Sequence, residues 1–358
     1  MVKRVIIGLI ALTVLAGLAV FFWPQPAYQP HQVNQKYQSQ VDAFDLPAMP
    51  KDWQWHRFSA VDGTNLRWGE TGNRGASKAT IIIVPGYTAT LDMYGEHVDL
   101  LAERGYHVMG LDLRGQGGSD RHFPKHPEKM WVEDFAIYSD DLAAFIKTHT
   151  RPERVVMPMA MSFGGHVAAR MAVDHPNVVD GYFLVAPAIE PLAGESAFED
   201  AGQQLNTAQK LGQGAKYLPG NGDWMPATPD DLLISGIEYC SSNPKRLPLR
   251  DVIFTRMPDR RVGGVTVQWG AEFFQSAVLM KQDGYFDDVT APVTMIAAER
   301  DDFVSNAAID RACEDLADCK LVRYPGTGHC LPQETDDVVF AMFDEIDVLY
   351  QRIIVARN

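Results

Sequence analysis

Short apolar runs and longer amphipathic stretches alternate over most of the chain. The apolar runs predict buried strands at 80–84, 107–111, 155–160 and 182–185. Amphipathic stretches of helical length lie between them, at 91–104, 131–148 and 163–174. A hairpin is predicted ahead of them, from 53–60 and 65–70 around the turn Asp62-Gly63. Strands that are apolar on both faces and alternate with helices predict an α/β fold, in which helices cover a mostly parallel sheet.

This alternation stops near Pro191 and resumes with a strand at 292–298. The residues between carry helical segments at 198–210, 230–240 and 267–280, with many Gly and Pro. A long insertion between two strands predicts a mainly helical cap over the carboxyl ends of the strands, where such sheets bind ligands. A helix at 307–316, a strand at 320–324 and a final helix at 336–354 then follow. The predicted core is therefore residues 52–190 and 291–358, and the cap is 191–290.

The N-terminus has a different pattern. Residues 5–23 are apolar or small, and a helix of about 19 residues spans about 28 Å, close to the thickness of the hydrocarbon core of a bilayer. Lys3 and Arg4 precede the run, which predicts that the N-terminus stays in the cytoplasm and the rest is exported. We expect residues 1–23 to anchor the protein in the inner membrane, with the catalytic domain on the periplasmic side. The alternative is a cleaved signal sequence and a secreted protein.

Residues 24–51 are rich in Pro, Gln and Tyr and show no apolar periodicity, so they are interpreted as a spacer between the membrane and the core.

Composition and charge exclude some functions. The net charge of −14 argues against a nucleic acid partner, because phosphate binding needs clustered Lys and Arg. No Cys or His spacing indicates a metal site, and no cofactor is predicted. Cys313 and Cys319 are close enough to form a disulfide in an oxidising compartment, although four unpaired thiols are equally compatible with the sequence.

The strongest chemical signal is a serine between a predicted strand and a predicted helix. Ala160, Ser162 and Gly164 form a small-x-Ser-x-Gly pattern, which is typical of a nucleophile elbow. Small residues are needed on both sides of the serine because the strand and helix backbones crowd there. The helix that begins after Ser162 also directs its N-terminal amides at the site, which favours developing negative charge.

A serine nucleophile needs a general base and a residue that orients that base. In this kind of fold the chain order is Ser, acid, His. The predicted strand 292–298 is followed by acidic residues, and the next strand is followed by His329 on a Gly-rich loop. We take His329 as the base and Asp301 as the acid, with Asp302 as the alternative and Glu299 a more distant one.

The oxyanion of the reaction needs two backbone N–H donors. One is expected from Phe163, the residue after the nucleophile. The other is expected from Tyr87, in the loop after the strand 80–84, where Gly86 lets the backbone approach.

From about Trp53 to the C-terminus, the chain resembles the bacterial lysophospholipase and monoacylglycerol lipase branch of the α/β-hydrolases, which also includes serine aminopeptidase-like members. The stretches that carry the resemblance are 83–88, 112–121, the serine elbow, 297–306, and 261–266 followed by Trp269. The resemblance implies a mostly parallel eight-stranded sheet, a triad of Ser162, Asp301 and His329, and oxyanion donors at Tyr87 and Phe163. Pro85, Ala160 and Met161 depart from the usual pattern of the family, at positions outside the triad.

The expected activity is hydrolysis of a carboxylic ester through an acyl-enzyme, with a lysophospholipid or monoacylglycerol as substrate. Cap residues are expected either to line an acyl tunnel or to pack the cap onto the core; they are Phe273, Phe274, Leu279 and Met280. An aminopeptidase of the same fold is an alternative, with a free amine bound by acidic cap residues, namely Glu195, Glu199 and Asp200. A non-catalytic, membrane-tethered binding protein is a further alternative, because a fold alone does not establish a function.

Overall fold

The computed structural model describes residues 27–357, apart from 73, 74, 76, 152, 193–196, 227, 229, 231 and 233–239. The predicted membrane segment 1–23 and most of the predicted helix 230–240 therefore lie outside the described residues. Among the helices that are described, none is long and apolar enough to span a bilayer. Residues from His31 onward form one compact unit.

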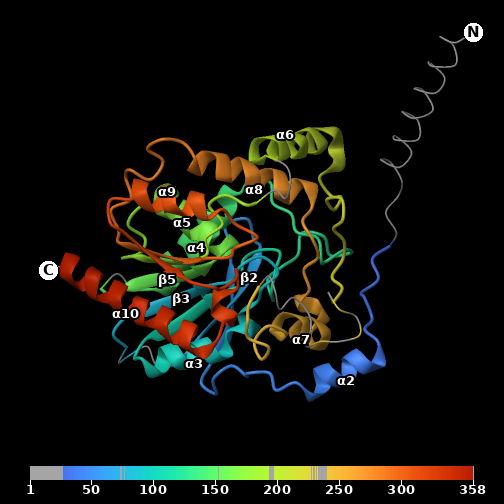
Figure 1. Ribbon diagram of the computed structural model, residues 1–358, viewed down its shortest axis with the longest axis horizontal. Coiled ribbons are helices and arrows are strands. Elements are labelled where there is room, and N and C mark those ends of the chain that lie inside the picture. The colour runs from blue at the N-terminus through green and yellow to red at the C-terminus, as the bar shows by residue number, and fades with distance from the viewer. Residues whose placement is uncertain are drawn as a thin grey trace, which may run out of the picture. The chain divides into compact units, whose positions relative to one another are not determined.

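The described residues build an eight-stranded sheet with the order β1-β2-β4-β3-β5-β6-β7-β8. Strands β2, β3 and β5 of this sheet are labelled in Figure 1. Its strands are β1 (Gln54–Ser59), β2 (Asn65–Glu70), β3 (Thr80–Val84), β4 (His107–Leu111), β5 (Val156–Met161), β6 (Tyr182–Val185), β7 (Val293–Ala298) and β8 (Cys319–Tyr324). Only the pairings β1–β2 and β2–β4 are antiparallel, and the other pairings are parallel. The predicted α/β fold with a mostly parallel sheet is confirmed.

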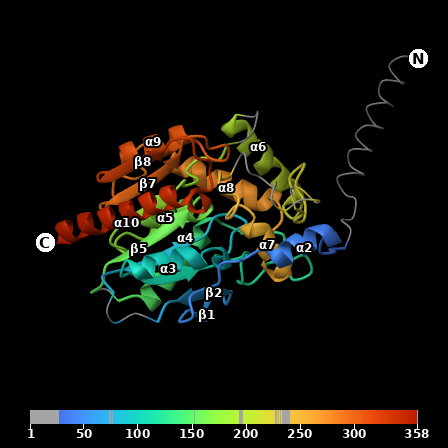
Figure 2. The ribbon, with the colours of Figure 1, turned by 60° about the horizontal axis from the view of Figure 1, so that its bottom comes forward.

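Helices cover both faces of this sheet, and each face has its own apolar core. On one face α4 (Ala136–His149), α5 (Phe163–Asp174) and α9 (Asn306–Asp315) pack on alternate strand residues such as Ile82 and Val84. On the other face α3 (Gly95–Glu103) and α10 (Asp336–Arg357) pack on the intervening residues, such as Ile81 and Ile83 (Figure 2). This division follows from the alternation of side chains along a strand, and it explains why the strands are apolar on both faces.

The segment between β6 and β7 forms the cap. Its described elements are α6 (Phe198–Ala208), the π-helical turn η2 (Gln209–Gln213), α7 (Leu249–Arg256), the 3-10 turn η4 (Pro258–Arg260) and α8 (Val267–Met280). Helix α8 has the predicted bounds, whereas α7 was not predicted. Two further 3-10 turns lie in the core, η1 (Leu91–Met93) and η5 (Leu331–Gln333).

The structure corrects the interpretation of residues 24–51 as a spacer, for the part that begins at His31. These residues include α2 (Gln35–Ala43), whose Tyr37 and Val41 are fully buried in a small cluster with Leu232 and Val252 of the cap. The Asn34 side chain caps this helix by accepting a hydrogen bond from the Tyr37 amide. Burial of two side chains against the cap makes this segment a part of the folded unit.

All four cysteines form disulfides, which pair Cys313 with Cys319 and Cys240 with Cys330. The first pair is the one that its short sequence separation favoured. The second pair joins the cap to the loop that carries His329.

Candidate active site

Ser162 lies on a strained turn between β5 and α5. Its φ of 51° and ψ of −114° are unfavourable for a residue with a side chain. The turn is held by hydrogen bonds from the Ser162 amide to the Val185 carbonyl (2.9 Å) and from the Ala188 amide to the Ser162 carbonyl (3.0 Å). A Cβ on Gly164 would lie 2.4 Å from the Val84 carbonyl oxygen, so glycine alone permits the close approach of α5 to β3. This is the geometry of the predicted nucleophile elbow.

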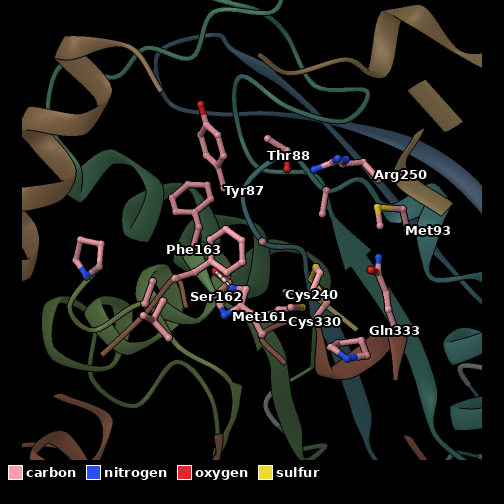
Figure 3. A pocket seen from close by; sticks show the side chains of 18 of the residues that line it. Tyr87, Thr88, Met93, Met161, Ser162, Phe163, Cys240, Arg250, Cys330 and Gln333 are labelled. Atoms are coloured by element: carbon pink, nitrogen blue, oxygen red, sulfur yellow. Dashed lines mark hydrogen bonds between the residues drawn. A yellow bond between two sulfur atoms is a disulfide. The ribbon is translucent and has the colours of Figure 1, made fainter. Parts of the chain in front are cut away.

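The structure brings Ser162, His329 and Asp301 together. Nε2 of His329 lies 2.9 Å from Oγ of Ser162, and Nδ1 lies 2.7 Å from Oδ2 of Asp301 (Figure 3). Each side chain comes from the carboxyl end of a different strand: Ser162 from β5, Asp301 from β7 and His329 from β8. With Nδ1–H donating to Asp301, Nε2 is the nitrogen that accepts the serine proton.

Asp301, rather than Asp302 or Glu299, contacts the histidine. The Asp301 side chain is fully buried, and its other oxygen accepts hydrogen bonds from the amides of Phe303 (2.9 Å) and Val304 (3.0 Å). Glu299 instead accepts a hydrogen bond from the Gly326 amide at 2.7 Å. The Asp301 carboxylate is therefore fixed at both oxygens, which is what orienting an imidazole requires.

The backbone N–H groups of Tyr87 and Phe163 lie beside Ser162. No hydrogen bond in the described part of the chain uses either N–H group as a donor. A Cβ on Gly86 would lie 3.2 Å from the Ser162 Cβ, so the Tyr87 loop runs close to the serine. Two such N–H groups next to a nucleophile are a suitable oxyanion site.

A pocket of about 410 Å³ opens above Ser162 between the sheet edge and the cap. Most of its lining is apolar or aromatic, with contributions from both parts of the core and from the cap; examples are Met93, Met161, Leu247, Trp269, Phe273 and Phe303. Such a pocket suits a substrate with an apolar chain and one polar reaction centre.

Of the cap residues expected to line an acyl tunnel or to pack the cap, only Phe273 lines the pocket. Phe274 stacks on Phe198 within the cap at 4.9 Å, Met280 is buried in the core, and Leu279 is 36% exposed. Met161, a departure from the family pattern, also lines the pocket.

The acidic residues considered for binding an amine do not line the pocket. Glu199 is exposed and forms an ion pair with Lys281 at 2.8 Å, and Asp200 is exposed. Glu195 lies outside the described residues.

Sequence reasoning missed a buried network that connects α5, the cap and the serine turn. His166 Nδ1 lies 2.8 Å from the Ala188 carbonyl, and its Nε2 lies 2.8 Å from Oγ of Ser276 in α8. Arg170 donates to the same Ser276 oxygen at 2.9 Å. Burial lowers the pKa of His166 to about 3, so the ring is neutral and structural. In the sequence, the available signal for this network was the position of His166, four residues after the serine.

Comparison with known proteins identifies the family. The family described as "Serine aminopeptidase, S33" matches residues 75–336. The chain belongs to this family of α/β-hydrolases. It is 32% identical over 280 residues to lysophospholipase L2 of Escherichia coli strain K12, and this alignment covers 76% of the chain and 78% of that relative.

Solved structures share the fold of this family member at lower identity. A soluble variant of monoglyceride lipase from Saccharomyces cerevisiae superposes with a TM-score of 0.66 at 17% identity, covering 87% of this chain and 99% of that one. A carboxyl esterase from Bacillus coagulans gives a TM-score of 0.63 at 15% identity, with 86% and 99% covered. The α/β-hydrolase fold and the family expected from the sequence are confirmed.

Proposed function

We propose that the protein is a serine esterase that hydrolyses a lysophospholipid or a monoacylglycerol through an acyl-enzyme. The observation that carries the proposal is the hydrogen-bonded series Ser162–His329–Asp301 at the floor of an apolar pocket. The E. coli relative is a lysophospholipase by name, and this supports a lipid ester as substrate.

In the proposed mechanism each of these groups has a role. His329 Nε2 takes the Ser162 proton as Oγ attacks the ester carbonyl, and the amides of Tyr87 and Phe163 donate to the oxyanion. The imidazolium then protonates the leaving alcohol, and the acyl group remains on Ser162. A water molecule, deprotonated by His329, then attacks the acyl-enzyme, and the imidazolium returns this proton to Ser162 Oγ as the fatty acid leaves. Asp301 holds the imidazole in the required tautomer and stabilises its charge.

Two alternatives have less support. An aminopeptidase needs a free carboxylate for the substrate amine, and among the described pocket residues the one carboxylate, Asp251, already accepts hydrogen bonds from Arg250 and Trp224. A non-catalytic binding protein would have no need for a serine in a strained conformation within hydrogen-bond distance of a histidine.

We further propose that residues 1–23 hold the protein at the inner membrane, with the catalytic domain in the periplasm. The apolar run and the preceding Lys3 and Arg4 support an anchor, and the two disulfides support an oxidising compartment. Protease added to spheroplasts should digest the domain, and carbonate washing should leave it in the membrane. Release of a shortened chain into the periplasm or medium would indicate signal cleavage instead.

A substrate panel tests the proposed activity. The full-length protein should hydrolyse p-nitrophenyl esters, monolauroylglycerol and a lauroyl lysophospholipid, and Ser162→Ala should abolish each reaction. Cleavage of aminoacyl amides with no ester hydrolysis would favour the aminopeptidase.

A further inference from the structure

A single cationic side chain of the Lys or Arg type faces the pocket, as far as the described lining residues show. This residue is Arg250, in the first turn of α7. Figure 3 shows its guanidinium extending into the pocket on the side of Thr88 and Met93. The surrounding wall is mostly apolar, so Arg250 places a positive charge among apolar side chains.

The guanidinium retains free donors. Its Nε donates to Asp251 at 3.0 Å, and no other hydrogen bond of the Arg250 side chain lies within the described part of the chain. Asp251 is buried and also accepts hydrogen bonds from Trp224 Nε1 (3.3 Å) and the Tyr37 hydroxyl (3.4 Å), so its carboxylate is shared among several donors. Both Nη groups of Arg250 therefore remain available for an anion.

Helix stability does not account for an arginine at this position. The first turn of a helix carries a partial positive charge, which disfavours a cationic side chain there. The side chain is also 41% exposed, so it contributes little to packing.

The segment that leads to Arg250 is firmly attached to the loop of His329. The Cys240–Cys330 disulfide joins the two, and the Ser242 hydroxyl and amide donate to the Glu334 carboxylate at 2.5 Å and 3.2 Å. Arg246 donates to Glu96 and Asp336, each at 2.6 Å. These contacts fix the position of the cation relative to the reaction centre, as a subsite for part of the substrate requires.

We propose that Arg250 binds the phosphate of a lysophospholipid whose ester carbonyl lies at Ser162. In such a substrate the phosphate is attached to the leaving glycerol, a few bonds from the scissile ester, whereas a monoacylglycerol has a neutral hydroxyl there. A bidentate guanidinium–phosphate contact would select the phosphorylated ester. This inference rests on the proposed esterase function and names the preferred substrate class within it.

The test compares two substrates with the same acyl chain. The full-length wild type and Arg250→Gln are assayed on 1-lauroyl-glycerophosphoglycerol and on 1-lauroyl-glycerol, each below its aggregation concentration. Arg250→Gln should reduce kcat/KM roughly 10- to 100-fold for the phospholipid and leave the neutral ester within about threefold of wild type. Arg250→Lys should recover part of the loss. Lys245→Gln, which removes the same charge from an exposed site outside the pocket, should change neither value.

The outcomes separate this inference from the esterase proposal. Equal losses on both substrates, or no loss on either, would overturn the phosphate subsite and leave the esterase function intact. If wild type hydrolyses neither lipid, the esterase proposal fails and the subsite fails with it. Retained activity of Arg250→Gln on the neutral ester shows in the same experiment that the variant is folded.

Discussion

Cys330 follows His329 directly in the chain and is bonded to Cys240 of the cap, with the two Cα atoms 4.7 Å apart. The Cys330 amide also donates to the Cys240 carbonyl at 2.6 Å. The general base is therefore held next to a covalent link, and the cap cannot move far from the base while this link is intact.

Replacing this disulfide should reduce both stability and turnover. The link spans a sequence separation of 90 residues, for which the chain-entropy estimate is about 4 to 5 kcal/mol of unfolding free energy, compared with about 2 kcal/mol for the separation of 6 between Cys313 and Cys319. We expect the double variant Cys240→Ser/Cys330→Ser to lose kcat by roughly tenfold or more, because His329 loses its support. Thermal unfolding and ester hydrolysis measure the two effects. The matched control Cys313→Ser/Cys319→Ser should melt only slightly earlier and keep its kcat; similar kcat values for both double variants would contradict this role.

The serine elbow should not tolerate a methyl group at Gly164. A Cβ there would lie 2.4 Å and 2.6 Å from the carbonyl oxygens of Val84 and Pro85, which are backbone atoms of the sheet and the oxyanion loop. We expect Gly164→Ala to destabilise the protein by about 1 to 3 kcal/mol and to reduce kcat, as judged by urea unfolding and ester hydrolysis. Gly202→Ala is the control, since its Cβ would meet Phe274 at an ordinary 3.4 Å. Equal stability of the two variants would show that the elbow is less crowded than described.

Asp301 and Asp302 provide a direct test of which acid orients the histidine. Asp301 accepts from His329 Nδ1 at 2.7 Å, whereas Asp302 is exposed. Asp301→Asn favours the wrong imidazole tautomer, so kcat should fall by about 10⁴-fold, while Asp302→Asn should remain within about threefold of wild type. The reverse order of effects in the ester assay would assign the role to Asp302.

Stability should decrease as the solution becomes acidic. Burial lowers the pKa of His97 to about 4 and that of His166 to about 3, whereas a histidine in an unfolded chain titrates near 6.5. Below pH 6.5 the unfolded chain therefore binds protons that the folded protein does not, and each histidine reduces the unfolding free energy by up to about 1.4 kcal/mol per pH unit toward its folded pKa. Urea unfolding between pH 7 and 5 should show this slope. It should be smaller in His97→Gln, which keeps a donor for the Pro332 carbonyl, and an unchanged slope would contradict the assignment.

The core of the fold could be predicted because its signals are local. Strands β3, β4 and β6 have the predicted bounds, since each is a short, mostly apolar run with a Pro or Asp within two residues of its end. Ser162 and His329 were found for a related reason, because each lies in the connection that follows a predicted strand, and parallel strands bring their carboxyl ends to one edge of the sheet.

Features that depend on distant contacts could not be predicted. Helix α2 has only Tyr37 and Val41 as buried residues, which is too weak a periodicity to separate it from a linker, and the cap residues that bury them lie far along the chain. Asn34 could have indicated the start of this helix, because asparagine is a common helix N-cap. The Cys240–Cys330 pair spans 90 residues, and sequence spacing does not choose among pairings of four cysteines. Arg250 can be recognised as a binding residue only from the pocket that surrounds it.

The most direct test of the account is covalent labelling of Ser162. The full-length protein is treated with a fluorophosphonate, the modified peptide is located by mass spectrometry, and ester hydrolysis is measured in parallel. Wild type should be labelled on Ser162, and Ser162→Ala should be unlabelled and slower by about three orders of magnitude or more. Labelling of a different residue, or hydrolysis by Ser162→Ala at the wild-type rate, would contradict this expectation.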